Sequence, residues 1–441
     1  MSFRNRRKSS GPSSNFMSIR RRSSATQRDF EILMFQKKQR FPDWLLIIIM
    51  LGGPVCLILF SLEISSDSNI ELFSLSGPLI VLLVSQLQLF FLWHIPAKEL
   101  IQLTEEDPPQ PIKHKNTSFE SCILICLIYL FGALLNLYPG ELVFIHWTSI
   151  LASLSIFCLL LLLLIFLFLP SQEDQRFDFS VISQIFYGRQ LRPVLLTVDI
   201  KAFITCRIGF TFWALYLISS IFEYQKLYPN EKPSFSLLTT FFLQFFYVLR
   251  RQWFEHLHTG LDNKNDRAGF YRIWMVLNLL ICLYLLPITI GIKEPEFERS
   301  SPLLCGILFL LGLFFQWINT TIDLQKYNFR QNIGQLKIDG KDPFYICARY
   351  RREGGEMGTT LLLGSGYWGL CRHPNYLTEF FTFLCWTLPW NDLLIYLPLI
   401  ILFLILWWRM VRDEIRCSIK YGQFWIQHCQ RVPYLLIPGI Y

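Results

Sequence analysis

Long apolar runs recur along most of this 441-residue chain, and they limit the folds open to it. Runs such as 142–169 and 393–408 contain no Asp, Glu, Lys or Arg, and only 17% of all residues are charged. Soluble domains carry roughly 25% charged residues. In a bilayer, an apolar run of about 20 residues forms a helix, because each backbone N–H and C=O must find its partner within the segment. The predicted fold class is therefore all-α, in a polytopic membrane protein.

The sequence predicts about ten transmembrane helices, since each apolar run is bounded by polar residues, glycine or proline. The segments are Leu45–Ile64, Leu72–Trp93, Cys122–Leu137, Leu142–Leu169, Ala202–Phe222, Phe235–Leu249, Ile273–Ile290, Leu303–Ile318, Phe380–Leu388 and Leu393–Trp408. We divide the chain into an arm (1–40), an N-terminal membrane part (41–240) and a C-terminal membrane part (241–441) that holds most polar clusters. No internal repeat of fixed period is visible, which disfavours a transporter built from inverted repeats.

The arm over 1–40 is rich in Arg and Ser, with blocks at Arg6–Ser10 and Arg20–Ser24. By the positive-inside rule it faces the cytosol or nucleoplasm, and it has too little apolar surface to fold alone. Two interpretations remain open. The arm is a disordered tail that sets topology, or it contacts nucleic acid, the lamina or anionic lipid and is switched by serine phosphorylation.

No metal site is expected. The 12 cysteines are scattered, mostly within apolar runs, and no CxxC is present. Buried cysteine in such runs behaves as a small apolar residue. Glu255 and His256 do not complete an HExxH motif, so a zinc site is not predicted.

The stretch Leu361–Tyr376, LLLGSGYWGLCRHPNY, differs from a simple lipid-facing helix. Its glycines allow tight turns, Trp368 offers a flat face, and the Arg372 guanidinium suits phosphate or carboxylate. One interpretation is a loop at the membrane interface; the other is the wall of a ligand site. Lys326 and Arg330 are four apart and would share a helix face that could also hold phosphate. No GxGxxG after a strand and no Walker loop is present, so a dinucleotide would need a site unlike the Rossmann fold.

Three segments carry a resemblance to a known family. LLLGSGYWGLCRHPNYL resembles the signature of the sterol C14/C7/C24(28) reductases, a family that includes the sterol reductase-like part of the lamin B receptor. The closing RDEIRCSIKYGQFWIQHCQRVPYLLIPGIY and the segment DLQKYNFRQNIG are similar to two further motifs of that family. The resemblance is strong over 320–441, moderate over 240–320 and only topological before that.

The resemblance implies an NADPH-dependent enzyme of the endoplasmic reticulum or inner nuclear membrane that reduces a sterol ring C=C, with an NADPH pocket and a sterol cleft in the C-terminal half. One ring carbon takes a proton from the protein and the other a hydride from the cofactor. Tyr247 and Asp413 would be the catalytic residues. The implied cofactor-binding residues are Lys326, Arg330, Leu363, Trp368, Asn375, Tyr376, Asp413, Cys417 and Tyr421, supported by Arg372, His373 and Arg409.

The resemblance is compatible with more than one sterol double bond, and with either an active or an impaired enzyme. The segment before the glycine-rich stretch favours the Δ7-sterol reductases, whereas the intact Arg-His-Pro-Asn-Tyr is typical of the Δ14 enzymes and the lamin B receptor. The family's tyrosine segment usually reads Tyr-x-x-Asp, but Arg250 stands in the acidic position here. An acid usual in the next span is also missing around Met275 and Val276. The alternative function is therefore a catalytically impaired nuclear-envelope tether.

Overall fold

The structure is a computed structural model of the chain. It describes residues 41–65, 74–97, 99–103, 111–169, 180–195, 198–257, 266–293, 300–351 and 357–440. The arm over 1–40 lies outside these residues, so both interpretations of it stay predictions.

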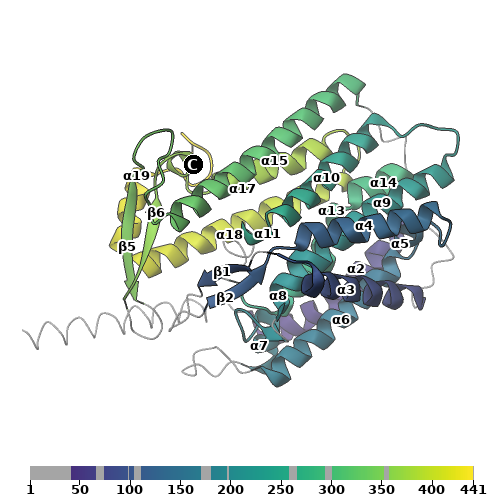
Figure 1. The fold of residues 1–441 in the computed structure, drawn as a ribbon, viewed down its shortest axis with the longest axis horizontal. Helices are drawn as coiled ribbons and strands as arrows, with labels where there is room; N and C mark the ends of the chain where they lie inside the picture. Colours follow the sequence, from purple (N-terminus) through teal and green to yellow (C-terminus); the bar gives the residue numbers. More distant parts are fainter. Residues whose placement is uncertain are drawn as a thin grey trace, which may run out of the picture.

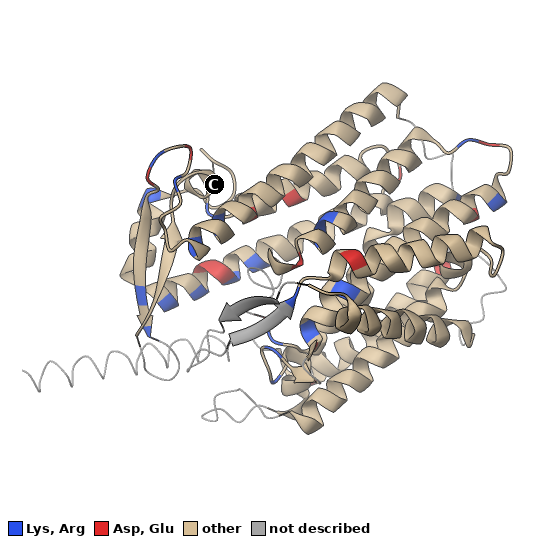
Figure 2. Cartoon of the chain, in the orientation of Figure 1, with Lys and Arg blue, Asp and Glu red and all other residues tan. Residues whose placement is uncertain are grey.

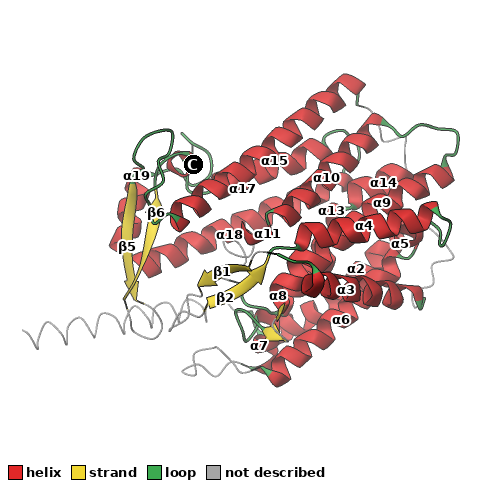
Figure 3. Ribbon diagram, in the orientation of Figure 1, coloured by secondary structure: helices red, strands yellow, loops and turns green. Residues whose placement is uncertain are grey.

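Helices make up most of the described chain and form one bundle (Figures 1 and 3). The N-terminal part holds α2 (Asp43–Ser65), α3 (Ser76–His94), α4 (Ser118–Leu134), α5 (Leu142–Ile145), α6 (Trp147–Phe168), α7 (Val181–Tyr187), α8 (Ile200–Ala202) and α9 (Gly209–Leu227). The helix α10 (Phe235–Trp253) crosses the boundary between the two parts. The C-terminal part holds α11 (Glu255–Leu257), α12 (Phe270–Trp274), α13 (Ile281–Tyr284), α14 (Leu286–Lys293), α15 (Pro302–Gln331), α16 (Tyr367–Leu370), α17 (Pro374–Thr387), α18 (Leu397–Tyr421) and α19 (Gln423–Arg431).

Seven helical stretches of the described chain are long and apolar enough to cross a membrane. All ten segments expected from the sequence fall on helices, but α4, α10 and α17 are not among the seven. The helix α4 has 17 residues and α17 has 14, while α10 carries Gln244, Arg250 and Arg251 among its apolar residues. The mostly helical, membrane-spanning architecture is confirmed, whereas the count of ten is not.

Three short antiparallel hairpins depart from the all-α prediction: β1 (Glu99–Leu103) with β2 (Pro111–Lys115), β3 (Val194–Leu195) with β4 (Val198–Asp199), and β5 (Tyr345–Arg351) with β6 (Met357–Leu363). The last pair matters for the site. Tyr345 pairs with Leu363 and Arg351 with Met357. Aromatic and β-branched residues in both strands suit a pleated surface. Figure 1 shows this hairpin beside α19 at one end of the bundle.

Three helices of the C-terminal half pack against one another: α10, α15 and α17. The Ser301 hydroxyl accepts from the Leu304 N–H at 3.3 Å and caps α15, whose first residue is Pro302. That helix continues for 30 residues and brings its polar last turns to the hairpin end. The helix α18 runs to the same end and stops at Gly422, which has a φ of +54°. Polar ends of separate helices thus meet beside β5 and β6.

Two of the helical stretches begin or continue with a π-helical segment inside the bundle. The segments η1 (Phe203–Ile208) and η3 (Met275–Leu280) are π-helical and continue directly into α9 and α13. They contact each other across the bundle. Single π-helical turns within α-helices are frequent at functional sites.

Candidate functional site

An apolar cavity lies among η1, η3, α10, α17 and α18. Its volume is about 1130 Å³, including the space at its mouth. Aromatic and aliphatic side chains form most of the wall, among them Phe210, Trp213, Tyr284, Leu402, Ile405 and Leu406. A cavity of this composition suits a large apolar molecule, with the few polar groups available to orient it.

A second, polar cavity of about 1480 Å³, again including its mouth, lies at the hairpin end of α15 and α18. Its wall carries seven cationic side chains: Lys326, Arg330, Arg372, Arg409, Arg412, Arg416 and Lys420. Four carboxylates oppose them: Asp266, Asp323, Asp413 and Glu414. Figure 2 shows basic positions gathered near the end of α18, whereas the bundle is largely uncharged. The excess of positive charge suits a ligand with several phosphates.

Lys326 and Arg330 line this cavity from successive turns of α15, as their spacing predicts. The Lys326 ammonium lies 3.5 Å from the centroid of the Trp368 ring. The Trp368 Nε1–H donates to the Ile322 carbonyl at 2.9 Å and fixes the indole against α15. One indole face is therefore already covered by a cation.

Gly366 sets the path of the glycine-rich stretch. Its φ is +63°, and a Cβ there would run into the side chain of Gln325. Gln325 Oε1 accepts from the Tyr367 N–H at 3.0 Å. The tight turn expected from glycine is present, and only glycine fits this approach to α15.

Arg372 joins the motif to the end of the chain. Its Nε donates to Glu414 Oε1 at 2.8 Å, and its Nη1 donates to the Val432 carbonyl at 2.8 Å. The Arg372 and His373 N–H groups donate to the carbonyls of Tyr434 and Leu435. Arg372 thus organises the wall of the polar cavity largely through contacts within the chain.

Two groups that line the polar cavity from outside the membrane helices have displaced pKa values. Burial opposes ionisation of Asp266, but Arg272, Arg412 and Arg409 overcome it and lower the pKa to about 2. Arg412 Nη2 lies 2.7 Å from Asp266 Oδ1. Burial, aided by Lys326, lowers the pKa of His428 to about 4, so its imidazole is neutral near pH 7.

The two cavities share four wall residues: Asp323, Asn375, Tyr376 and Arg409. Asn375 Nδ2 donates to Asp323 Oδ1 at 3.1 Å, and Asn319 Nδ2 donates to the Asn375 carbonyl at 2.8 Å. The Oδ1 of Asn375 is buried and has no hydrogen-bond partner in the part of the chain that the structure describes. A polar ligand at this junction would satisfy it and would face the apolar cavity.

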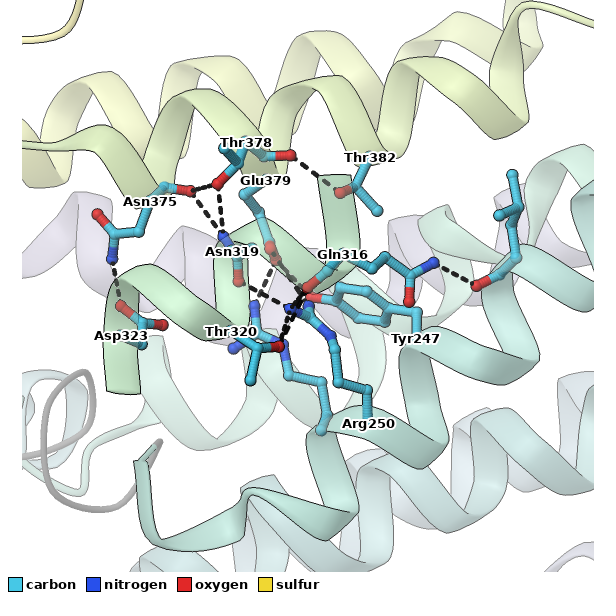
Figure 4. A network of polar contacts seen from close by, with 12 residues as sticks. Tyr247, Arg250, Gln316, Asn319, Thr320, Asp323, Asn375, Thr378, Glu379 and Thr382 are labelled. Atoms are coloured by element: carbon cyan, nitrogen blue, oxygen red, sulfur yellow. Dashed lines mark hydrogen bonds and ion pairs between the residues drawn. The ribbon is translucent and has the colours of Figure 1, made fainter. Parts of the chain in front are cut away.

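Tyr247 faces the apolar cavity from α10, with its ring fixed by aromatic neighbours. The ring centroids of Trp213, Phe383 and Trp386 lie 5.5, 5.6 and 5.6 Å away. The hydroxyl donates to Glu379 Oε1 on α17 at 2.5 Å (Figure 4). Although Arg250 stands where the family usually has an acid, Tyr247 therefore still has an acidic neighbour.

Comparison with known sequences agrees with this geometry. The sequence model of the ergosterol biosynthesis ERG4/ERG24 family matches residues 80–441. The chain belongs to this family. The predicted resemblance to sterol reductases is thereby confirmed.

Individual members of the ERG4/ERG24 family are similar to this chain. It is 35% identical to a 7-dehydrocholesterol reductase from Arabidopsis thaliana over 276 residues, 62% of this chain and 63% of that one. It is 28% identical to the Delta(14)-sterol reductase TM7SF2 from Mus musculus, over 79% of this chain and 82% of that one. It is 27% identical to the Delta(14)-sterol reductase LBR from Gallus gallus, over 78% of this chain and 53% of that one. The chain spans less than two thirds of the Arabidopsis reductase.

The structure brings twelve of the thirteen sequence-predicted site residues together. All but Tyr247 line the polar cavity: Lys326, Arg330, Leu363, Trp368, Arg372, His373, Asn375, Tyr376, Arg409, Asp413, Cys417 and Tyr421. Three of these, Asp413, Cys417 and Tyr421, recur every four residues on one face of α18. Tyr247 and Asp413, expected to act together, line different cavities. Asp413 Oδ1 instead pairs with Arg416 Nη2 at 2.7 Å.

Several cavity residues were not predicted as site residues from the sequence. Glu379 and Arg251 line the apolar cavity, Asp323 lies at the junction, and His428 lines the polar cavity. Glu379 comes four residues after Asn375, so the helical spacing of the motif contained a signal for it.

Proposed function

We propose that this ERG4/ERG24 family member reduces a sterol ring C=C with NADPH, with the Δ7 bond favoured and the Δ14 bond next. One observation carries the proposal: a cation-rich cavity and an apolar cavity share a wall at Asp323, Asn375, Tyr376 and Arg409. A reduction needs a phosphate-bearing cofactor and an apolar substrate to meet at one place, and this junction offers it.

The polar cavity carries basic and polar side chains that suit NADPH. Lys326 and Arg330, with the basic residues of α18, would hold the phosphates. The unsatisfied Oδ1 of Asn375 would accept from polar groups of NADPH. The buried Nδ1 of His428, which has no partner among the described residues, would accept or donate according to its tautomer. NADPH supplies a hydride when bound.

Tyr247 is the proposed proton donor. Its hydroxyl lies at the wall of the apolar cavity, where a sterol would be held away from water. When the sterol double bond takes the proton, the Tyr247 O–H bond breaks and a C–H bond forms. The neighbouring ring carbon becomes electron-poor and takes the hydride. Asp413 is the second proposed catalytic residue, and it would act from the polar cavity.

Two relatives support the choice of bond to different degrees. The 7-dehydrocholesterol reductase of Arabidopsis has the higher identity, whereas the mouse Delta(14)-sterol reductase aligns over more of the chain. The direct test is to express the chain in cells that lack their own Δ7 or Δ14 reductase and analyse the sterols. Formation of neither product, at good expression, would refute the proposal.

A second proposed function is a nuclear-envelope tether, since a relative named LBR aligns over 78% of this chain. The proposed location is the endoplasmic reticulum membrane, including the nuclear envelope. Removal of residues 1–40 should then abolish binding to chromatin, lamina or anionic vesicles. Unchanged binding and location after this deletion would exclude the tether.

A further inference from the structure

Asn375 leaves one acceptor atom open where the two cavities meet. Its Oδ1 is buried and has no hydrogen-bond partner among the residues that the structure describes, whereas its Nδ2 donates to Asp323 Oδ1 at 3.1 Å. Asn375 and Asp323 both line the polar and the apolar cavity. A buried acceptor without a partner is rare in folded proteins, because it has lost its hydration without gaining a hydrogen bond. The open Asn375 oxygen is therefore suited to a donor on a ligand.

The helix α15 holds Asn375 from two successive turns. Asn319 Nδ2 donates to the Asn375 carbonyl at 2.8 Å, and Asp323, four residues later, receives the side-chain amide. Residues four apart share a helix face, so α15 holds the main chain and the side chain of Asn375 together (Figure 4). Asn319 is itself fixed, because its Oδ1 accepts from Arg250 Nη1 at 2.9 Å and its Nδ2 donates to Thr378 Oγ1 at 3.0 Å. The position of Asn375 is thus set by its neighbours.

The chemistry of Asp323 decides which end of the Asn375 amide is left for a ligand. An ionised carboxylate only accepts hydrogen bonds, whereas an asparagine amide has a donor end and an acceptor end. Beside Asp323 the amide must direct its N–H group to the carboxylate, since the reverse orientation would bring two oxygens together. Lys326 and Arg409 lie in the same wall of the polar cavity, and nearby cations stabilise the charge of a carboxylate. The amide oxygen, and not the nitrogen, therefore remains open.

The open oxygen restricts the part of a cofactor that can lie against Asn375. Phosphate oxygens only accept hydrogen bonds, so they suit the cations of the polar cavity and not this oxygen. The nicotinamide ring carries an NH2 donor on its carboxamide, next to the ring carbon that gives the hydride. That part of the cofactor must also face an apolar substrate, as the junction of the two cavities does.

Resting on the proposed function, we propose that Asp323 is a positioning residue that makes the junction selective for a pyridine ring with a carboxamide. Asp323 fixes the Asn375 amide, and Asn375 Oδ1 accepts from the carboxamide NH2 group. The cations of the polar cavity would hold any dinucleotide with the same phosphates. The Asp323–Asn375 pair distinguishes a nicotinamide ring from a ring that lacks the donor.

The test measures dissociation constants of the detergent-purified full-length chain for three oxidised ligands, so that no turnover is needed. These are NADP+, its thionicotinamide analogue, which keeps the NH2 group, and its 3-acetylpyridine analogue, in which a methyl group replaces NH2. All three carry the same phosphates. The wild type should bind the acetylpyridine analogue at least about tenfold more weakly than NADP+, because the Asn375 oxygen then stays without a donor. The thionicotinamide analogue should bind nearly as well as NADP+.

Asp323→Asn separates positioning from packing. The new side chain has the same shape, but its amide can accept or donate, so the Asn375 amide is free to turn. The preference for NADP+ over the acetylpyridine analogue should fall at least about threefold. Asn375→Ala should also lower this preference, and adding Asp323→Asn to it should have no further effect, because Asp323 acts through Asn375. Asp323→Ala is measured beside Asp323→Asn and should lower the preference in the same way.

Thr321→Val is the control on α15. The Thr321 hydroxyl donates to the Trp317 carbonyl of its own helix at 3.0 Å, and Thr321 lines neither cavity. Its preference among the three ligands should equal that of the wild type. A merely structural role of Asp323 would weaken all three ligands alike and leave the preference unchanged.

Equal binding of NADP+ and the acetylpyridine analogue by the wild type would overturn the inference without any variant. An unchanged preference in both Asp323 variants would overturn it as well, as would a further fall when Asp323→Asn is added to Asn375→Ala. Sterol reduction is scored separately. A wild type that keeps the preference but reduces no sterol overturns the proposed function alone, and one that binds none of the three ligands overturns both.

Discussion

Replacement of Lys326 by methionine should weaken NADPH binding strongly while leaving the fold intact. Methionine keeps a long unbranched side chain against the Trp368 ring, which the ammonium approaches to 3.5 Å, but it removes the charge. A hydrogen bond from a charged donor to phosphate contributes roughly 1.5–3 kcal/mol. At 1.4 kcal/mol per tenfold, the dissociation constant should rise about 10- to 150-fold.

The assay is a titration of detergent-purified protein with NADPH at fixed ionic strength. Lys226→Met is the matched control, because Lys226 is 58% exposed and pairs with Glu141 outside both cavities. Its affinity should equal that of the wild type. The dependence of affinity on salt should be weaker in Lys326→Met, since one cation is lost. Equal dissociation constants for Lys326→Met and wild type would refute the placement of phosphate beside Lys326.

Three further changes test other parts of the structure. Gly366→Ala should cost about 1–3 kcal/mol of stability and weaken NADPH binding, because its φ is +63° and its Cβ would displace Gln325; thermal unfolding and titration measure both. Glu255→Gln should cost about 3–5 kcal/mol, seen as a lower unfolding temperature, because it leaves the buried Arg207, 3.0 Å away, without its charge partner. Burial holds the pKa of His428 at about 4, below its ordinary 6.5, so the unfolded chain binds the proton first. Stability should therefore be complete above pH 6.5 and fall toward pH 4, and His428→Asn should lessen that fall.

The polar cavity could be predicted from the sequence because most of its residues lie in short motifs. Helical spacing alone places Lys326 with Arg330 and Asp413 with Cys417 on shared faces. Glycine in the stretch Leu361–Tyr376 indicated the turn that Gly366 makes. The helix positions also followed from the apolar runs. The number of membrane-spanning helices did not follow from these runs, because α4 and α17 are short and α10 mixes apolar residues with arginine.

The surroundings of Tyr247 could not be predicted in the same way. Tyr247 and Glu379 are 132 positions apart, and their contact depends on how α10 packs against α17. In the sequence, Arg250 stands where the family usually has an acid, so Tyr247 lacks its usual acidic neighbour there. In the folded chain Arg250 is anchored on α15 and lies beside an acid from a third helix.

The π-helical segments η1 and η3 limit the deletions that this protein can tolerate. Each residue of an α-helix turns the chain by about 100°, and a π turn inserts one extra residue. Arg207 in η1 pairs with Glu255, and Trp213, six residues further on in α9, lines the apolar cavity. Removing a single residue from η1 would rotate every later side chain of α9 by about 100° and take the indole out of the cavity wall. The shape of the apolar cavity therefore depends on the number of residues in η1 and η3. One-residue deletions there should disrupt the cavity more than most substitutions.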